Sequence, residues 1–235
     1  MKSSIAPLAH PTLFATALAL ALAACGGADP AANAASAAGA PADAPTTASA
    51  SASASASASA SAVPRFADGH DACFSAVAAE LGADASVSEI TSLFSADSGE
   101  LQVCTVDYQD PDDPRKLVGQ RLDPATGQFS EPHDIELSVS GNAADFRLED
   151  YLLPLSQVDV AALSAVMDAQ KPALDGIYSS YSWTGVRLVP PGAFSDEHTL
   201  RLDLEGRLAS NDIKNNGYLS VSTDGATVAA NHLLP

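Results

Sequence analysis

Positively charged side chains are scarce in this sequence. Its 235 residues include 11 Lys and Arg against 29 Asp and Glu, a formal net charge of −18 at pH 7. Nucleic-acid binding depends on Lys and Arg that neutralise phosphates, and anionic lipid headgroups attract the same residues. The composition therefore argues against a nucleic-acid partner and against electrostatic adsorption to a membrane. The simplest role of the negative charge is to keep the protein in solution.

Recognisable catalytic motifs are also missing. The sequence has no Gly-x-Ser-x-Gly elbow, no glycine-rich phosphate loop and no His-Glu-x-x-His pair. Beyond the N-terminal segment its histidines are scattered near expected loops or element ends, at His70, His133, His198 and His232. We therefore expect no cofactor and no enzymatic activity. A hydrolase whose carboxylates meet only in three dimensions is the alternative, because so acidic a chain offers many such pairs.

One run of aspartates has the composition of a calcium loop. It lacks the central Gly and the terminal Glu of an EF-hand, and its prolines are typical of an ordinary turn. The run comprises Asp107, Asp110, Asp112 and Asp113. We expect no metal site here.

An apolar stretch at residues 13–24 follows a single lysine near the N-terminus. A bilayer span needs about 20 residues, so this stretch has the length of a signal-peptide core. It ends in the sequence LAAC at residues 22–25, which resembles the bacterial lipobox. The resemblance implies a signal peptide over 1–24 and a lipid anchor on Cys25, through which the protein contacts the membrane. An ordinary secretory signal with a chance cysteine is the alternative.

Two glycines follow Cys25, in place of the aspartate that retains lipoproteins at the inner membrane. The resemblance therefore implies an outer-membrane lipoprotein that faces the periplasm or the cell surface. Residues 26–62 are almost entirely Ala, Ser, Pro, Gly and Thr. They have little to bury, so we expect a disordered tether, which as a random coil spans about 30–35 Å.

Only Cys73 and Cys104 remain once Cys25 is lipidated. In an oxidising compartment such a pair is first interpreted as a disulfide. Cys73 falls early in an expected helix, and Cys104 falls on the strand face expected to lie beneath that helix. Zinc usually takes four ligands at close local spacing, which the sequence does not offer. We predict a structural disulfide.

The globular region is long enough to bury a core, and its pattern predicts an α+β fold. We expect two helix-on-antiparallel-sheet units in tandem, 63–145 and 146–235. In the first unit, apolar spacing predicts a helix over 68–81 that ends at Gly82. Alternation and turn signals predict strands over 101–108, 116–122 and 135–139, with a turn at 123–127. Residues 87–94 have helical spacing, but their β-branched residues and the turn that follows favour a strand over a helix.

The second unit follows the same order. Residues 156–159 resemble a capping box that opens a helix, Pro172 should break or kink it, and Asp175-Gly176 should form a turn. Strands are expected over 177–188, 200–204, 207–213, 218–222 and 227–233. Hairpin signals lie between them at Asn215-Asn216-Gly217 and Asp224-Gly225.

A short match supports an internal duplication. The sequence RLD at 121–123, followed by Gly127, parallels RLD at 201–203, followed by Gly206. The stretch LDPATGQF at 122–129 is similar to the strand-turn ending of PepSY domains, and the whole pattern resembles the tandem modules of β-lactamase-inhibitor-type proteins. The resemblance implies a non-enzymatic module that binds or inhibits an envelope protein. The second unit departs from it, with LEG where Thr-Gly is expected.

The strand expected from residue 177 carries the most suggestive surface candidate. Alternation places Tyr181 and Trp183 on one face and Tyr178 on the other. Exposed Tyr and Trp often form protein-binding hot spots, so we predict a binding face at Tyr181 and Trp183. The alternative is that Trp183 is core packing. A purely structural envelope lipoprotein is the remaining hypothesis for the protein as a whole.

Overall fold

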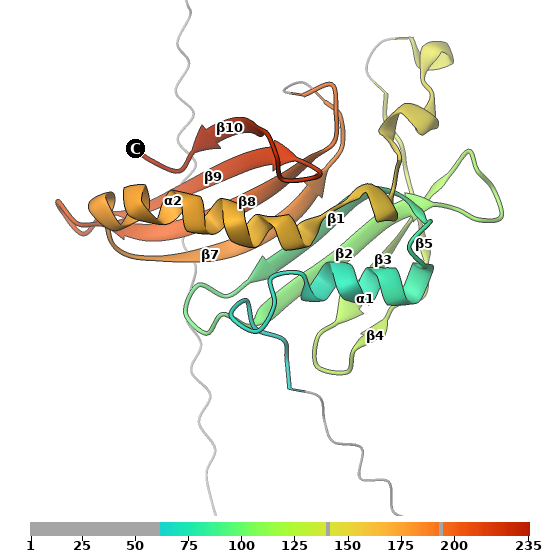
Figure 1. Cartoon of the computed structure of the whole chain (residues 1–235). Coiled ribbons are helices and arrows are strands. Elements are labelled where there is room, and N and C mark those ends of the chain that lie inside the picture. Colours follow the sequence, from blue (N-terminus) through green and yellow to red (C-terminus); the bar gives the residue numbers. More distant parts are fainter. Residues whose placement is uncertain (1–61, 140–141, 193–194) are drawn as a thin grey trace, which may run out of the picture. The chain divides into compact units, whose positions relative to one another are not determined.

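The computed structural model describes residues 62–139, 142–192 and 195–235 (Figure 1). The expected signal peptide, Cys25 and the tether as far as residue 61 lie outside the described residues. Across the described parts of the chain, neither helix has the length and apolar character needed to cross a membrane.

The fold is mixed α+β, as the sequence predicts. A ten-stranded antiparallel sheet has the order β10-β9-β8-β7-β1-β2-β3-β4, with β5 beside β3 and β6 beside β1. The strands are β1 (Ser86–Phe94), β2 (Leu101–Gln109), β3 (Leu117–Asp123), β4 (Gln128–Phe129), β5 (His133–Ile135), β6 (Leu153–Pro154), β7 (Tyr178–Val189), β8 (Thr199–Leu208), β9 (Lys214–Ser222) and β10 (Val228–His232). Because β1 pairs with β7, strands from both halves of the region form one continuous sheet.

Both α-helices cover the same face of this sheet (Figure 1). They are α1 (Ala72–Leu81) and α2 (Leu163–Ile177), and between them lie 3₁₀ turns at Ala143–Asp145, Leu148–Tyr151, Leu155–Gln157 and Val160–Ala162. Strand side chains alternate between faces, so Ile90, Val186 and Leu202 point to the covered side and are buried. The buried apolar residues form a single core.

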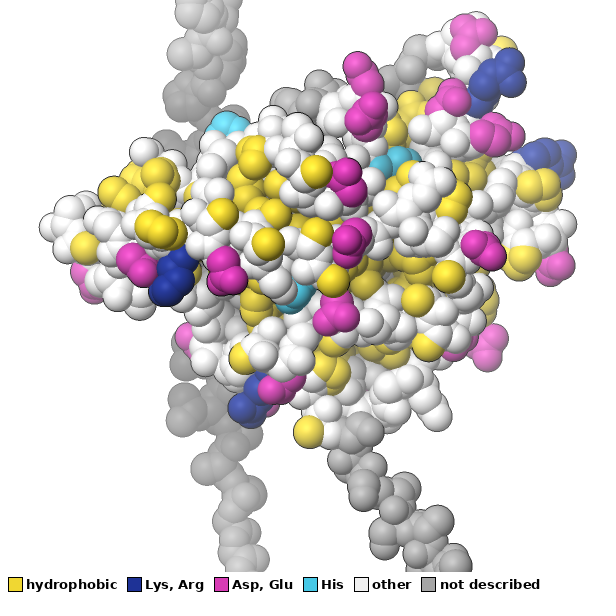
Figure 2. All heavy atoms as spheres, in the orientation of Figure 1, with side chains coloured by type: hydrophobic (Ala, Val, Ile, Leu, Met, Phe, Trp, Pro, Cys, Tyr) yellow, Lys and Arg dark blue, Asp and Glu magenta, His cyan; other side chains and the backbone are white. Residues whose placement is uncertain are grey.

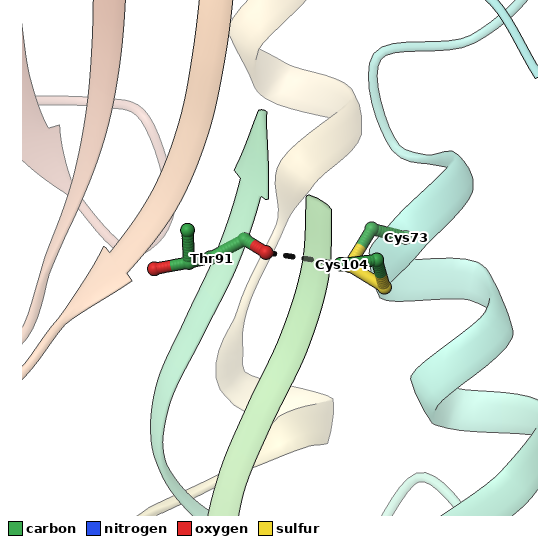
Figure 3. Close-up of a disulfide and its surroundings, with 3 residues drawn as sticks. All are labelled: Cys73, Thr91 and Cys104. Carbon is green, nitrogen blue, oxygen red and sulfur yellow. Dashed lines mark hydrogen bonds between the residues drawn. A yellow bond between two sulfur atoms is a disulfide. The ribbon is translucent and has the colours of Figure 1, made fainter. Parts of the chain in front are cut away.

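The disulfide predicted from the sequence is present. Cys73 in α1 and Cys104 in β2 are fully buried, with an S–S distance of 2.05 Å and a Cα–Cα distance of 5.5 Å (Figure 3). The Cys73 Sγ also lies 3.8 Å from the carbonyl oxygen of Thr91. A disulfide sulfur carries no proton, so this is a contact and not a hydrogen bond. The bridge ties the first helix to the sheet.

The predicted elements of the first half are largely confirmed. The helix begins later than expected, at Ala72, because residues 66–68 form a turn before it. The first three strands lie where they were expected, and the turn at 123–127 precedes β4. The strand expected over 135–139 is wrong, because pairing with β3 involves only residues 133–135.

The capping box, the break at Pro172 and the turn at Asp175-Gly176 that were predicted for the second helix are all wrong. Asp159, not Ser156, caps the 3₁₀ turn Val160–Ala162 that runs directly into α2: its Oδ1 accepts a hydrogen bond from the Ala162 N–H at 3.2 Å. Pro172 does not end α2, which continues through Asp175-Gly176 to Ile177. Proline removes one backbone hydrogen bond, but the burial of Leu174 beyond it favours continued helix.

Two strands of the second half differ from the prediction. The strand expected over 200–204 continues to Leu208 as β8, so Gly206 lies in a strand and not in a turn, and the strand expected over 207–213 is wrong beyond Leu208 because residues 209–213 connect β8 to β9. The Asn215-Asn216-Gly217 hairpin is also wrong, because these residues belong to β9. The β8–β9 connection instead contains Asp212 with φ 58°, a conformation that Asp tolerates. The turn at Asp224-Gly225 is confirmed.

The RLD match does not mark equivalent positions. Residues 121–123 end β3 and lead into a turn, whereas residues 201–203 lie in the middle of β8. β3 is the third strand after α1, and β8 is the second strand after α2. The shared letters therefore reflect strand alternation.

Candidate functional site

The face of the sheet opposite the helices carries polar side chains. On β7, β8 and β9 the cross-strand pairs Arg187–Arg201, Arg201–Ser220 and Asp203–Tyr218 all point to this side. Their side chains are half-buried, in contrast to the fully buried leucines that alternate with them. We call this surface the open face.

Two arginines lie directly opposite each other at the centre of this surface. Like charges in a cross-strand pair destabilise a sheet unless another group separates them. Asp203 supplies that group: its Oδ2 lies 2.9 Å from Arg187 Nε, and its Oδ1 accepts a hydrogen bond from Arg201 Nε at 2.8 Å. The Arg187 contact is an ion pair whose atoms are not aligned for a hydrogen bond. The three side chains together carry one positive charge.

Gly185 makes room for the bridging carboxylate. It pairs with Asp203 across the β7–β8 ladder. An added Cβ on Gly185 would lie 2.8 Å from Asp203 Oδ2 and 3.1 Å from Leu93 Cδ2. A glycine inside a strand commonly marks such a close approach. The position of the Asp203 carboxylate between the arginines therefore depends on a residue without a side chain.

Arg201 is held from a second direction. Its guanidinium carbon lies 4.0 Å from the centroid of the Tyr218 ring, within the range of a cation–π contact. The Tyr218 ring in turn lies against His232, with centroids 4.7 Å apart. The stack places an aromatic ring and a guanidinium group side by side on the open face, both partly exposed to solvent.

Arg201 and Tyr218 border two grooves. One, of about 280 Å³, is lined with Arg187, Asp203, Glu205 and Asn216 beside them. The other, of about 170 Å³, is lined by Val189, Pro190, Gly192, Ser195, Thr199, Ser220, Ala229 and Ala230 as well. The first groove is charged, whereas the second joins one guanidinium to an apolar wall.

A second polar cluster lies on the open face of β1, β2 and β5. Burial raises the pKa of Asp107, the Glu89 carboxylate raises it further, and His133 opposes both. Glu89 and Asp107 are cross-strand partners, so the two carboxylates repel each other. A carboxyl with a raised pKa is one requirement of a general acid.

The aromatic residues singled out from the sequence lie on the covered side. Tyr181 and Trp183 are half-buried against the core, and the Tyr181 hydroxyl donates a hydrogen bond to Asp175 Oδ1 at 3.0 Å. The expectation that Tyr178 faces the other way is wrong. Irregularities in the β7–β8 pairing shift the alternation, so the Tyr178 ring lies 6.2 Å from that of Tyr181.

The remaining candidates are dispersed. His70 hydrogen-bonds to the carbonyl oxygen of Val160 at 2.9 Å, and burial lowers the pKa of His198. In the acidic run, Asp113 forms an ion pair with Arg115 that lowers its pKa to about 2. Within residues 62–139, 142–192 and 195–235, no group of three or more His, Cys, Asp or Glu side chains is arranged to hold a metal ion.

Sequence reasoning missed the cluster of Arg187, Arg201 and Asp203. The only local signal is the alternation of Arg201 and Asp203 with buried leucines, which predicts that both point away from the core. Arg187 belongs to another strand, so its position opposite Arg201 depends on the β7–β8 register.

No protein-family model, curated protein or solved structure matches this chain. Its function is therefore argued from its own residues.

Proposed function

We propose that this chain is a lipid-anchored protein of the bacterial envelope whose globular region binds another protein without catalysing a reaction. One observation carries the proposal: both helices cover the same side of a large sheet, which leaves the other side open and polar. Arg and Tyr are enriched in protein interfaces and in their hot spots, and both lie at the centre of the open face.

The distribution of charge supports this choice of surface. Figure 2 views the helix-covered side, where acidic side chains are spread between apolar ones and the Lys and Arg lie towards the margins. The open face instead brings two arginines together beside one carboxylate. In a chain with a net charge of −18, this is a surface on which a partner meets local positive charge.

The envelope location is proposed from the N-terminal sequence. The LAAC sequence at 22–25 supports lipidation of Cys25, and the two glycines that follow it support an outer-membrane position. The Cys73–Cys104 disulfide supports folding in an oxidising compartment such as the periplasm. The alanine- and serine-rich segment that follows Cys25 would let the globular region reach a partner away from the lipid surface.

We also propose that the globular region arose from two tandem α+β units, 63–145 and 146–235. The support is the order of elements, since α1 is followed by β1 to β4 and α2 by β7 to β10. In the sheet the first strand of each series pairs with the other, and the remaining strands extend outwards in chain order. The order of one helix followed by strands in each half is the pattern on which the resemblance to tandem inhibitor-type modules rests.

The test is cross-linking of the tagged full-length chain in intact envelopes, followed by mass spectrometry. We expect one envelope protein to be enriched with the unchanged chain and lost with Tyr218→Ala. Arg115→Ala is a suitable control, because Arg115 is exposed in a turn outside the open face. Equal enrichment with both variants would contradict binding through the open face. The anchor is tested separately by incorporation of labelled palmitate, and incorporation that is unchanged in Cys25→Ser would contradict lipidation at Cys25.

A further inference from the structure

The smaller groove of the open face combines two chemistries. Its apolar wall contains Val189, Pro190 and the alanines of β10, and its polar lining contains Arg201, Tyr218 and the hydroxyl residues Ser195, Thr199 and Ser220. Pockets for drug-sized molecules occupy about 300–1,000 Å³, so a groove of about 170 Å³ admits a single small residue. A ligand that fills it has one anionic end and one small apolar group.

The Arg201 guanidinium is oriented for an incoming anion. Among the described residues, its only hydrogen bond runs from Nε to Asp203 Oδ1 at 2.8 Å, and its guanidinium carbon lies over the Tyr218 ring, 4.0 Å from the centroid. The two terminal nitrogens thus remain for a ligand. A guanidinium group offers parallel N–H donors that match the two oxygens of a carboxylate. Because Asp203 and Tyr218 fix its position, little side-chain entropy is lost on binding.

The local charge is favourable despite the acidity of the whole chain. Arg187, Arg201 and Asp203 sum to one positive charge, and the nearby Glu205 is neutralised by Lys214 at 2.7 Å. At physiological ionic strength, charges more than about 8 Å away are largely screened. A carboxylate bound at Arg201 therefore meets a cluster of side chains with one net positive charge.

From these features we infer that the groove beside Arg201 binds the C-terminal residue of a peptide chain. Arg201 receives the terminal carboxylate, and Val189, Pro190 and Ala230 receive a small apolar side chain. This inference rests on the proposed function and names the chemistry of its partner: a protein with an accessible C-terminus that ends in a small apolar residue. A phosphate group would leave the apolar wall without a contact.

Fluorescence anisotropy of a labelled Gly-Gly-Val peptide, titrated with the full-length chain in detergent, tests the inference. We expect the peptide with a free carboxylate to bind at least tenfold more tightly than its C-terminal amide. Arg201→Gln should weaken binding at least tenfold, whereas Arg115→Gln should leave it unchanged. Equal binding of acid and amide would overturn the inference, as would inorganic phosphate that binds as tightly as the peptide.

A second variant keeps the test independent of the Asp203 network. Ala230→Leu extends a side chain from the edge strand into the groove and leaves both arginines in place. We expect it to weaken the free-acid peptide at least tenfold, with an unchanged thermal transition; undiminished binding would contradict the assigned groove. If the chain captures an envelope protein through the open face but binds no peptide, the proposed function survives and this inference fails.

Discussion

The Tyr178 ring packs directly over Gly206. A Cβ added to Gly206 would lie 2.6 Å from Tyr178 Cδ1, closer than van der Waals contact allows. The Tyr178 hydroxyl donates a hydrogen bond to the carbonyl oxygen of Leu233 and accepts one from Asn215 Nδ2, each at 2.6 Å. One buried tyrosine thus connects β7 and β9 to the C-terminal segment, and it does so because β8 has no side chain at residue 206.

Replacement of Gly206 by alanine should therefore destabilise the protein. Overpacking of a core costs about 1–3 kcal/mol, because neighbouring side chains must leave their preferred rotamers. Urea denaturation followed by circular dichroism measures this change in the free energy of unfolding. Gly176→Ala is the matched control, since nothing lies within 4 Å of its added Cβ and the helix favours alanine. An equal effect of both variants would contradict the packing explanation.

Loss of the disulfide should lower stability more strongly. Cys73 and Cys104 are 31 residues apart, and on the chain-entropy model a bridge of this span stabilises by about 3–4 kcal/mol. The double variant Cys73→Ala with Cys104→Ala should unfold at a lower urea concentration than the oxidised protein. Reductant should destabilise the unchanged chain but not the double variant. If the bridge contributes nothing, the unchanged chain and the double variant should have the same urea midpoint, with and without reductant.

Ionisation of Asp107 should lower the stability of the folded protein as the pH rises. Burial and the Glu89 carboxylate raise the pKa of Asp107 above its ordinary value of 3.8, so the folded state binds this proton more tightly than the unfolded state. Below pH 3.8 the carboxyl is protonated in both states, so the free energy of unfolding is not reduced. Above the raised pKa the carboxyl is ionised in both states, and the reduction is complete. Asp107→Asn should therefore stabilise the protein at neutral pH and lose this advantage as the pH falls.

Asp113 provides the opposite case. The hydrogen bond from Arg115 lowers its pKa to about 2, so its contribution is present above pH 3.8 and is lost as the pH falls towards 2. Asp113→Asn should be only slightly destabilising at neutral pH, because Arg115 is exposed to solvent and an ion pair at the surface contributes little. Thermal transitions of both variants between pH 3 and 7 provide the measurement. Shifts of the same sign at pH 7 would contradict the assignment of causes.

Replacement of Trp183 by alanine distinguishes a role in core packing from the binding role that the sequence suggests. The side chain is half-buried against the core on the helix-covered side. Trp183→Ala should therefore lower stability, by less than the about 3–5 kcal/mol of a fully buried aromatic residue. Capture of the proposed envelope partner, measured below the unfolding transition, should be retained. Lost capture with unchanged stability would support the hot spot predicted at Tyr181 and Trp183.

Local sequence patterns predicted the elements whose conformation depends on near neighbours. The alternation in residues 101–108 indicated β2, the stripe of Phe74 and Val77 indicated α1, and the turns at 123–127 and 224–225 were found from their turn residues. These signals are local because a turn or one helical face is defined within a few residues. The disulfide was also predictable, since only two cysteines remained to pair.

The open face could not be derived from the same signals. Arg187 and Arg201 meet because β7 and β8 pair in one register, and β1 joins β7 although more than 80 residues separate Leu93 from Gly185 in the chain. The sequence around Gly206 and Gly217 predicts turns, yet both glycines lie inside strands where another chain segment approaches closely. Long-range packing overrode local preference at these positions.

The sequence by itself determined the α+β class, the disulfide and most of the strands, because periodicity, cysteine number and turn chemistry act over short stretches of chain. Tertiary structure alone decided that the strands form one sheet, that both helices cover the same face, and that Asp203 lies between two arginines. These relationships depend on register between strands distant in sequence. A shift of one residue would move every side chain to the opposite face.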